Sequence, residues 1–347
     1  MRILALDLGK NKTVGCDFEI ESGNHEYMTI STTPEAIHDV IVERSPKRLV
    51  LEICSAAGWV HDLAKAFEIE VQVANPTHEG WRWRSIKRKN DRLDALKLAK
   101  LSAMNQLPLV HMPANDNRQW RSFIQYRDHL MKRRTRIKNH IRAVLDRQGL
   151  TMPPGKQGWT VASIDALRQV AQAPAEVKKN ELWRAELWLE LQAFESADEL
   201  IRQVHTVLNN LGVMTPQVQR LQGIPGVGPR LAEAVVAVID DPRRFKRGKQ
   251  VASYVGLTPR QYQSGSMDRQ GGISGQGHRL LRSLLIEVSW LGLQHNAWMR
   301  EVYKRTLRGT PSRKKIAIVA VARRLLIRCW AMLRDESCWS CPIKEAA

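Results

Sequence analysis

The chain has 347 residues, 43% of them hydrophobic, which is enough for two or three domains with buried cores and excludes a disordered polymer. It contains neither an apolar run of eighteen residues nor a signal-peptide pattern, so we expect a cytoplasmic protein without membrane partners. A net charge of +19 favours a polyanionic partner, and nucleic acid is the leading candidate, so we expect association with the nucleoid.

The first 75 residues predict a mixed α/β sheet. Short apolar runs bounded by polar residues predict strands, and two stretches with helical spacing interrupt them. Strands that alternate with helices after a three-stranded meander indicate a mixed sheet. The predicted strands are 2–8, 13–20, 25–31, 48–54 and 69–75, and the predicted helices are 34–44 and 59–67.

Two long amphipathic patterns follow, at 114–147 and 176–212, with a Pro/Gly break at 151–158 between them. They predict a long helical coiled-coil arm whose two helices run antiparallel. Between Arg82 and Arg142 the chain has seventeen Lys or Arg and only four acids, so this region is expected to hold much of the nucleic acid.

The last third predicts a mostly helical domain. It begins with 221–239, continues through a Gly/Ser-rich loop from Ser264 to Gly277, and ends with helical runs at 278–295 and 311–334. The predicted domains are therefore 1–112, 113–213 and 214–347.

Four carboxylates are candidates for a metal site. Asp7 and Glu52 end predicted strands, and open α/β sheets place their ligands at such edges. Asp91 and Asp94 are three residues apart, which on a helix puts them on one face. Oxygen ligands suit hard cations such as Mg²⁺, and a pair of these ions can assist phosphodiester cleavage.

Each acid alone has a simpler structural explanation. Asp91 can cap a helix, with Asp94 favoured in its first turn, and Asp7 can begin a turn before Gly9. Glu52 is different because it stands within the apolar run RLVLEIC, where a buried carboxylate requires a partner.

The segment TPRQYQSGSMDRQGGISGQGHR at 258–279 is a second candidate site. Its small residues let backbone approach a phosphate, and Ser264, Ser266 or Tyr262 could attack phosphorus with help from a base or metal. A flexible turn is the alternative. Four side chains could donate hydrogen bonds to phosphate: Arg260, Arg269, His278 and Arg279.

Two further patterns suggest nucleic-acid contact. GIPGVGP at 223–229 resembles a helix-hairpin-helix motif, in which backbone N–H groups near Gly226 and Gly228 cradle a phosphate, although a tight turn between helices is the alternative. Interleaved aromatic and basic residues can stack on bases or hold phosphates, although alternating tryptophans can also be packed core. These residues are Trp81, Arg82, Trp83, Arg84, Lys87, Arg88 and Lys89.

Taken in order, LALDLGK, VLEIC, NDRLDA, QGIPGVGP, VASYVGLTPRQYQSGS and GGISGQGHRLLRSLL resemble the DEDD transposases of the insertion-sequence-110 family, relatives of the Piv invertases. The resemblance implies an RNase H-like domain similar to that of RuvC, with Asp7, Glu52, Asp91 and Asp94 binding two Mg²⁺ ions, for which Mn²⁺ can substitute. It also implies a C-terminal transposase domain whose serine nucleophile is Ser264, with Ser266 as the alternative.

The family resemblance further implies a function. Such a protein excises and inserts a mobile element through a covalent phosphoserine intermediate, guided by a noncoding bridge RNA. The serine of one subunit meets the metal-binding acids of another, so the partners are double-stranded DNA at the element ends and target, the RNA, and further copies of the chain, as dimers that form a tetramer.

Two other functions fit the same residues. A RuvC-like junction-resolving nuclease would use only the carboxylates, and a structural nucleic-acid-binding protein would use the basic helices with the acids serving as caps. The nuclease would still nick DNA after loss of Ser264, whereas the transposase would not. The structural protein would bind nucleic acid equally well without Mg²⁺ or Glu52.

Overall fold

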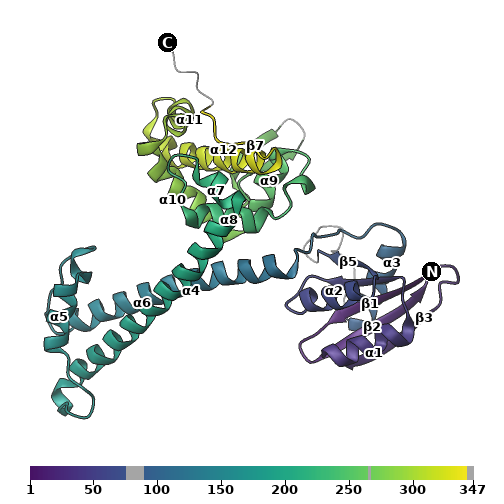
Figure 1. The fold of residues 1–347 in the computed structure, drawn as a ribbon, viewed down its shortest axis with the longest axis horizontal. Coiled ribbons are helices and arrows are strands. Elements are labelled where there is room, and N and C mark those ends of the chain that lie inside the picture. Colours follow the sequence, from purple (N-terminus) through teal and green to yellow (C-terminus); the bar gives the residue numbers. More distant parts are fainter. Residues whose placement is uncertain (76–89, 265–266, 342–347) are drawn as a thin grey trace. The chain divides into compact units, whose positions relative to one another are not determined.

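The computed structural model describes residues 1–75, 90–264 and 267–341 (Figure 1). They divide into two compact units, Met1–Arg118 and Gln119–Ala347. The first unit extends a few residues beyond the predicted domain 1–112. The further division of the second unit near residue 213 stays a prediction.

The first unit is built on a five-stranded sheet in the order β3-β2-β1-β4-β5. β1 pairs antiparallel with β2, and β2 with β3, whereas β4 runs parallel to β1 and β5 parallel to β4. This is a mixed α/β arrangement, as predicted. The strands are Arg2–Leu8 (β1), Lys12–Glu19 (β2), His25–Ser31 (β3), Arg48–Glu52 (β4) and Glu70–Ala74 (β5).

Both faces of this sheet are covered because alternate strand residues point to opposite sides. Leu4, Leu6 and Leu51 pack under helices α1 (Pro34–Arg44) and α2 (Ala57–Ala66). On the other face, buried β1 and β4 residues such as Ala5 and Val50 pack against Ala95, Leu98 and Ala99 of helix α3 (Asp91–Ala103). Each large aliphatic side chain buried this way contributes about 1.5–3 kcal/mol.

The second unit contains two long helices, α4 (Asn115–Asp146) and α6 (Leu182–Met214), with α5 (Val161–Val170) between them in sequence. Ile141 near the end of α4 packs with Leu187 near the start of α6, whereas Ile124 packs with Leu208. The helices are therefore antiparallel. The description of this pair as a coiled-coil arm stays a prediction.

The rest of the second unit is mostly helical and surrounds one large apolar core. Its helices are α7 (Pro216–Gln222), α8 (Pro229–Ile239), α9 (Gly248–Val255), α10 (Arg279–His295), α11 (Ala297–Leu307) and α12 (Lys314–Arg334). One-turn 3-10 helices lie at Gln157–Trp159, Lys179–Glu181, Pro242–Arg244 and Pro311–Arg313. Throughout the described ranges, no helix has the length and apolar character needed to cross a bilayer.

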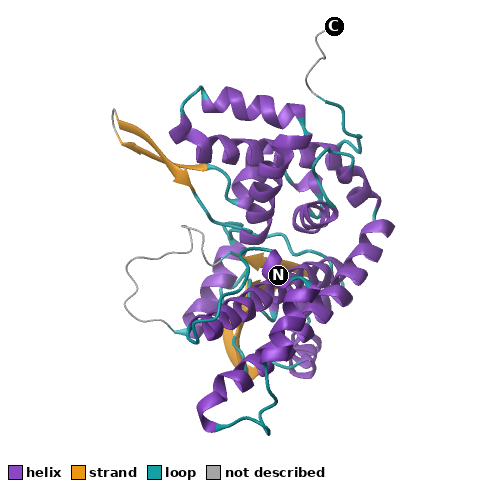
Figure 2. Cartoon of the chain, turned by 90° about the vertical axis from the view of Figure 1, so that its left-hand side faces the viewer, coloured by secondary structure: helices purple, strands orange, loops and turns teal. Residues whose placement is uncertain are grey.

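The predicted Gly/Ser-rich loop from Ser264 to Gly277 is partly wrong, because its first half forms a two-stranded antiparallel hairpin with the residues before it. Its strands are β6 (Pro259–Ser264) and β7 (Met267–Ile273), and Figure 2 shows them reaching out from the helices. These strands could not be predicted from an apolar alternation, because the segment is polar. A hairpin that faces solvent on both sides needs no such alternation.

Candidate active site

Two carboxylates lie side by side on adjacent strands of the first unit. Leu6 of β1 is directly opposite Leu51 of the parallel strand β4, so Asp7 and Glu52 occupy the next positions of the two strands. Alternation puts both on the sheet face that α3 covers, together with Ala5 and not with Leu6. Both carboxylates are half-buried.

Helix α3 brings the other two acids to the same place. Its N-cap is Asn90, whose side chain accepts a hydrogen bond from the backbone N–H of Arg92, so Asp91 is not the cap that sequence reasoning allowed. Asp91 and Asp94 lie in the first turn, where the helix dipole stabilises negative charge. Burial of Leu98 against the sheet fixes where this turn sits.

Three of the four predicted acids form one cluster. Asp7, Asp91 and Asp94 each offer a carboxylate oxygen, and these oxygens all lie within 4.8 Å of one another. Two oxygens on opposite sides of one Mg²⁺ ion lie about 4 Å apart, so small side-chain rotations would bring this set to a hard cation. The donor set, all carboxylate oxygen, fits such an ion. Glu52 is outside this group of three.

Lys97 lies beside these acids, one turn of α3 after Asp94. Burial lowers the pKa of the Lys97 ammonium, and the charges of Asp94 and Glu52 oppose that change. Its electrostatic interaction with both acids indicates that Glu52 lies at the same edge. Lys97 was not among the predicted site residues, although its spacing of three from Asp94 puts both on the same helix face.

The predicted nucleophile belongs to the second unit. Ser264 is the last residue of β6, so its backbone stands at the far end of the hairpin, and β7 resumes at Met267. The alternative nucleophile Ser266 lies outside the described residues. Of the predicted phosphate donors on the hairpin, Arg269 is exposed, and Arg260 donates a hydrogen bond to the carbonyl of Ser274.

His278 and Arg279 lie where the hairpin returns to the helices. His278 is the N-cap of α10, and its Nδ1 accepts the backbone N–H of Leu281 at 3.2 Å. Burial lowers the pKa of His278, and the nearby Arg121 and Arg282 lower it further, which favours the neutral imidazole. Arg279 is exposed in the first turn. His278 therefore acts here as a cap and a neutral donor, not as a cation.

The segment between α7 and α8 has the short turn that a helix-hairpin-helix requires. Gly226 has a positive φ of 91°, and Gly228 is the N-cap of α8. Both are exposed. A Cβ on Gly226 would lie 3.1 Å from the Cα of Gly292, so close packing against α10 also favours glycine there. Phosphate binding by this turn stays a prediction.

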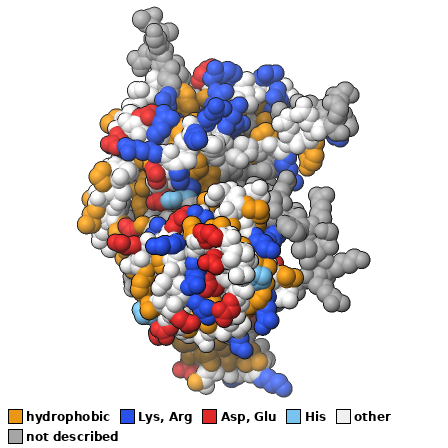
Figure 3. All heavy atoms as spheres, turned by 90° about the vertical axis from the view of Figure 1, so that its right-hand side faces the viewer, with side chains coloured by type: hydrophobic (Ala, Val, Ile, Leu, Met, Phe, Trp, Pro, Cys, Tyr) orange, Lys and Arg blue, Asp and Glu red, His pale blue; other side chains and the backbone are white. Residues whose placement is uncertain are grey.

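The predicted aromatic and basic segment from Trp81 to Lys89 lies outside the described residues. Elsewhere, Lys and Arg gather on the C-terminal helices at the top of the view in Figure 3. Residues 304–315 alone hold six Lys or Arg and no acid. This surface is the kind that attracts a phosphate backbone.

Comparison with protein families gives two matches along the chain. Residues 4–149 match a DEDD transposase model of the IS110 type, and residues 218–304 match the model described as "Transposase IS116/IS110/IS902 family". Together the two models match about two thirds of the 347 residues.

Several curated proteins are similar over most of the chain. A "Probable family 20 transposase" of Pseudomonas aeruginosa is 29% identical, covering 87% of this chain and 88% of that protein. The "Transposase for insertion sequence element IS1111A" of Coxiella burnetii is 29% identical over 84% of this chain and 79% of its own. The "Pilin gene-inverting protein" of Moraxella lacunata is 25% identical over 77% of this chain and 73% of its own.

Among solved structures, Thermus thermophilus RuvC in complex with a Holliday junction substrate aligns with 12% identity and a TM-score of 0.24, covering 32% of this chain and 99% of that one.

Proposed function

The chain belongs to the IS116/IS110/IS902 family of transposases, and on this premise we propose that it excises and inserts a mobile DNA element by serine attack on phosphodiesters, assisted by Mg²⁺ and guided by RNA. It is a DNA transposase or recombinase. The observation that supports the chemistry is the convergence of Asp7, Asp91 and Asp94 within 4.8 Å.

In the proposed reaction the carboxylates of Asp7, Asp91, Asp94 and Glu52 hold divalent cations. When bound, such ions stabilise negative charge on the phosphoryl oxygens and lower the barrier to attack by a weak hydroxyl nucleophile. Mn²⁺ has similar ligand preferences and should substitute. Lys97 offsets the repulsion among the carboxylates before a cation arrives.

Ser264 then attacks phosphorus. Its Oγ–P bond forms while the bond between phosphorus and the leaving sugar oxygen breaks. The serine proton passes to solvent, and the leaving oxygen takes up a proton. The phosphoserine keeps the linkage as an ester, so a hydroxyl from another strand can attack it, restore the serine and join new partners. This distinguishes recombination from hydrolysis.

The partners follow from the same proposal. Double-stranded DNA at the element ends and target is the substrate, and a noncoding bridge RNA selects both through base pairing. Several subunits, dimers that form a tetramer, bring Ser264 of one copy to the acids of another. Sequencing of RNA that copurifies with the full chain tests the guide, and recovery of no element-encoded RNA would refute guidance without touching the DNA chemistry.

Strand exchange between donor and target plasmids tests the active site. We expect Asp7→Asn and Ser264→Ala each to lower exchange by at least about 1000-fold, because each removes a group that acts in the chemical step. The matched controls are Asp39→Asn and Ser253→Ala, two exposed positions away from the site, and these should recombine like the parent.

A second readout separates recombination from hydrolysis. The parent chain should form a protein–DNA adduct that survives denaturation, and Ser264→Ala should form none. If Ser264→Ala still nicks DNA at the parent rate and no adduct forms with either protein, the chain is a hydrolytic nuclease that uses only the carboxylates.

A further inference from the structure

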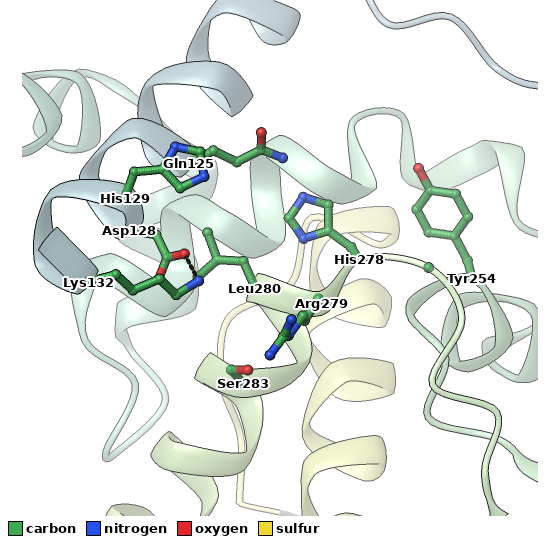
Figure 4. A pocket seen from close by; sticks show the side chains of 10 residues that line it. Gln125, Asp128, His129, Lys132, Tyr254, His278, Arg279, Leu280 and Ser283 are labelled. Atoms are coloured by element: carbon green, nitrogen blue, oxygen red, sulfur yellow. Dashed lines mark hydrogen bonds and ion pairs between the residues drawn. The ribbon is translucent and has the colours of Figure 1, made fainter. Parts of the chain in front are cut away.

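A cavity of about 680 Å³ lies at the base of the β6–β7 hairpin, entirely within the second unit (Figure 4). Three segments form its walls: α4, the end of α9, and the start of α10 with the loop that leads into it. Its volume is typical of sites for small ligands. Its lining combines one aromatic ring with amide, carboxylate, imidazole and cationic groups, supplied by Tyr254, Gln125, Asp128, His278, Lys132 and Arg279.

The walls are held by close backbone contacts, so the cavity is preformed. Gly277 has a φ of 84°, and a Cβ on it would lie only 2.1 Å from the carbonyl oxygen of Tyr254. The guanidinium of Arg282 donates to the carbonyls of Val255 and Gln276 at 2.8 and 2.9 Å. These contacts tie the end of α9 to the segment that enters α10.

Tyr254 offers a fixed aromatic surface. Its ring centroid lies 4.5 Å from the Arg244 guanidinium carbon and 5.4 Å from the ring of Phe245, which together hold the ring in place. The residue nevertheless remains 39% exposed. An aromatic ring that is supported by protein neighbours and still exposed is the usual platform for stacking a nucleic-acid base.

His278 stands beside Tyr254 at the same cavity, and Figure 4 shows the Gln125 amide pointing toward it from α4. Because Nδ1 of His278 accepts the N–H of Leu281, the proton of the neutral ring is on Nε2, which can donate. An amide offers both a donor and an acceptor. A base edge carries the complementary groups.

Positive charge lies on both sides of the cavity. Lys132 comes from α4, where it is paired with Asp128, and Arg279 comes from the first turn of α10, whose N-terminus is itself positive. A second cavity of about 590 Å³ continues along α4 from the same Lys132 and His129 to Thr135 and Arg136. The two together form a pocket large enough for a nucleotide, and this pocket opens into a cationic groove.

We propose that this pocket takes one unpaired nucleotide of a nucleic-acid strand, its base beside Tyr254 and His278 and its phosphodiester backbone leaving along the groove from Lys132 to Arg136. The inference rests on the proposed function, because the strand is the DNA or guide RNA of the recombinase. β6 extends about 17 Å from Pro259 to Ser264. The pocket thus anchors a strand near the proposed nucleophile.

Competition binding to the full-length chain tests this directly. The Ser264→Ala variant is used with a chelator present, so that neither cleavage nor a metal ion contributes. Two probes of equal length are compared, single-stranded oligothymidylate and the same sugar-phosphate backbone without bases. We expect the bases to raise affinity on the order of 10-fold, the effect of one stacked base.

Two cavity variants should lose that preference. Tyr254→Leu should bind both probes nearly equally, whereas Tyr254→Phe should behave like the parent because it keeps the ring. Gln125→Ala, at an exposed position, should reduce the preference a few-fold. Tyr126→Leu removes an exposed aromatic ring of α4 outside the cavity and should change nothing.

The proposal is overturned if the parent shows no preference for bases, which would make the cavity a phosphate site only, or if Tyr254→Leu and Gln125→Ala both keep the preference. Comparing oligouridylate with oligothymidylate shows whether the nucleotide comes from RNA or DNA. Because this assay requires neither the serine nor the carboxylates, its failure leaves the recombination chemistry standing, and failure of strand exchange leaves the pocket standing.

Discussion

Lys97 places a positive charge beside carboxylates that we propose hold divalent cations. Without a cation, Asp94 and Glu52 would repel each other, and the ammonium reduces that repulsion. Once a divalent cation is bound, the positive charge of Lys97 repels it and weakens its binding. Lys97 therefore acts in opposite directions in the two states of the site.

We expect Lys97→Met to raise the apparent Mg²⁺ affinity a few-fold, because it removes a positive charge beside the proposed cation. The free energy of unfolding of the metal-free protein should not fall, because the cost of burying the Lys97 charge exceeds its attraction to Asp94 and Glu52, and stabilisation by added Mg²⁺ should be larger than in the parent. Melting temperature measured across a Mg²⁺ titration checks both effects. Lys100→Met, at an exposed position near the end of α3, is the control. Unchanged Mg²⁺ affinity in Lys97→Met would contradict this role.

Glu233 is a buried carboxylate of α8 that takes no part in the proposed chemistry. Arg230 donates two hydrogen bonds of 3.0 Å to it. Burial nevertheless raises the pKa of Glu233 from 4.5 to about 7, and the charges of Arg230 and Arg127 only partly oppose this. The folded protein therefore holds the Glu233 proton more tightly than the unfolded chain does.

This pKa makes stability depend on pH in a definite direction. Because the folded pKa is the higher one, the contribution of Glu233 is fully present below pH 4.5 and is lost as pH rises to about 7. We expect Glu233→Gln to remove this loss, on the order of 3 kcal/mol, so the variant should gain stability relative to the parent between pH 5 and pH 8. Urea unfolding at both pH values measures it. Exposed Glu301→Gln is the control, and parallel pH profiles for parent and Glu233→Gln would refute the prediction.

At the scale of elements, the hairpin that carries Ser264 depends on two glycines at its base, Gly256 and Gly277. Gly256 ends α9 with a φ of 79°, and a Cβ there would lie 1.8 Å from the carbonyl oxygen of Gln276. The segments that enter and leave the hairpin can approach this closely only without a side chain. The hairpin's direction is thus set at its base.

Gly256→Ala should destabilise the protein by about 3 kcal/mol, from strain at a positive φ combined with a backbone clash. Gly272→Ala is the matched control, since Gly272 lies in β7 with no atom within 4 Å of an added Cβ. Thermal unfolding of the two variants compares them. Equal melting temperatures would contradict the prediction, because they would show that the backbone at the base of the hairpin can shift without loss of stability.

Sequence patterns predicted most of the first unit because its strands and helices each bury one apolar side. The predicted β1, β3 and α1 have the bounds found in the structure. The β6–β7 hairpin and the short helices α5, α9 and α11 were not predicted. The hairpin lacks an apolar alternation. The short helices are stabilised by contacts with distant elements, α9 and α11 in the large C-terminal core and α5 in the core between α4 and α6, which local patterns do not show.

The same distinction holds for the sites. Asp7, Asp91 and Asp94 could be selected because strand ends and a three-residue helical spacing are local signals. The proposed nucleotide pocket could not, because Gln125 on α4 and His278 before α10 meet only through the packing of helices far apart in sequence. His278 was selected as a phosphate donor, but its burial and capping role emerge only from the fold.

At the scale of the whole molecule, the proposed reacting groups are divided between two compact units. The acids belong to Met1–Arg118 and Ser264 to Gln119–Ala347. An assembly in which the serine of one copy acts with the acids of another would prevent an isolated chain from cutting DNA. Cleavage would then depend on the assembly of subunits around both DNA partners.

Mixing two inactive variants tests this arrangement. Asp7→Asn and Ser264→Ala should each fail to form a covalent DNA adduct alone. If the site is shared between copies, half of the randomly mixed dimers combine both variants, and each of these has one intact site of two. The mixture should therefore recover roughly a quarter of the parent's adduct. Recovery is measured by denaturing gel after the two variants are coexpressed. A site contained within one chain would recover none, because every chain in the mixture lacks either the acid or the serine.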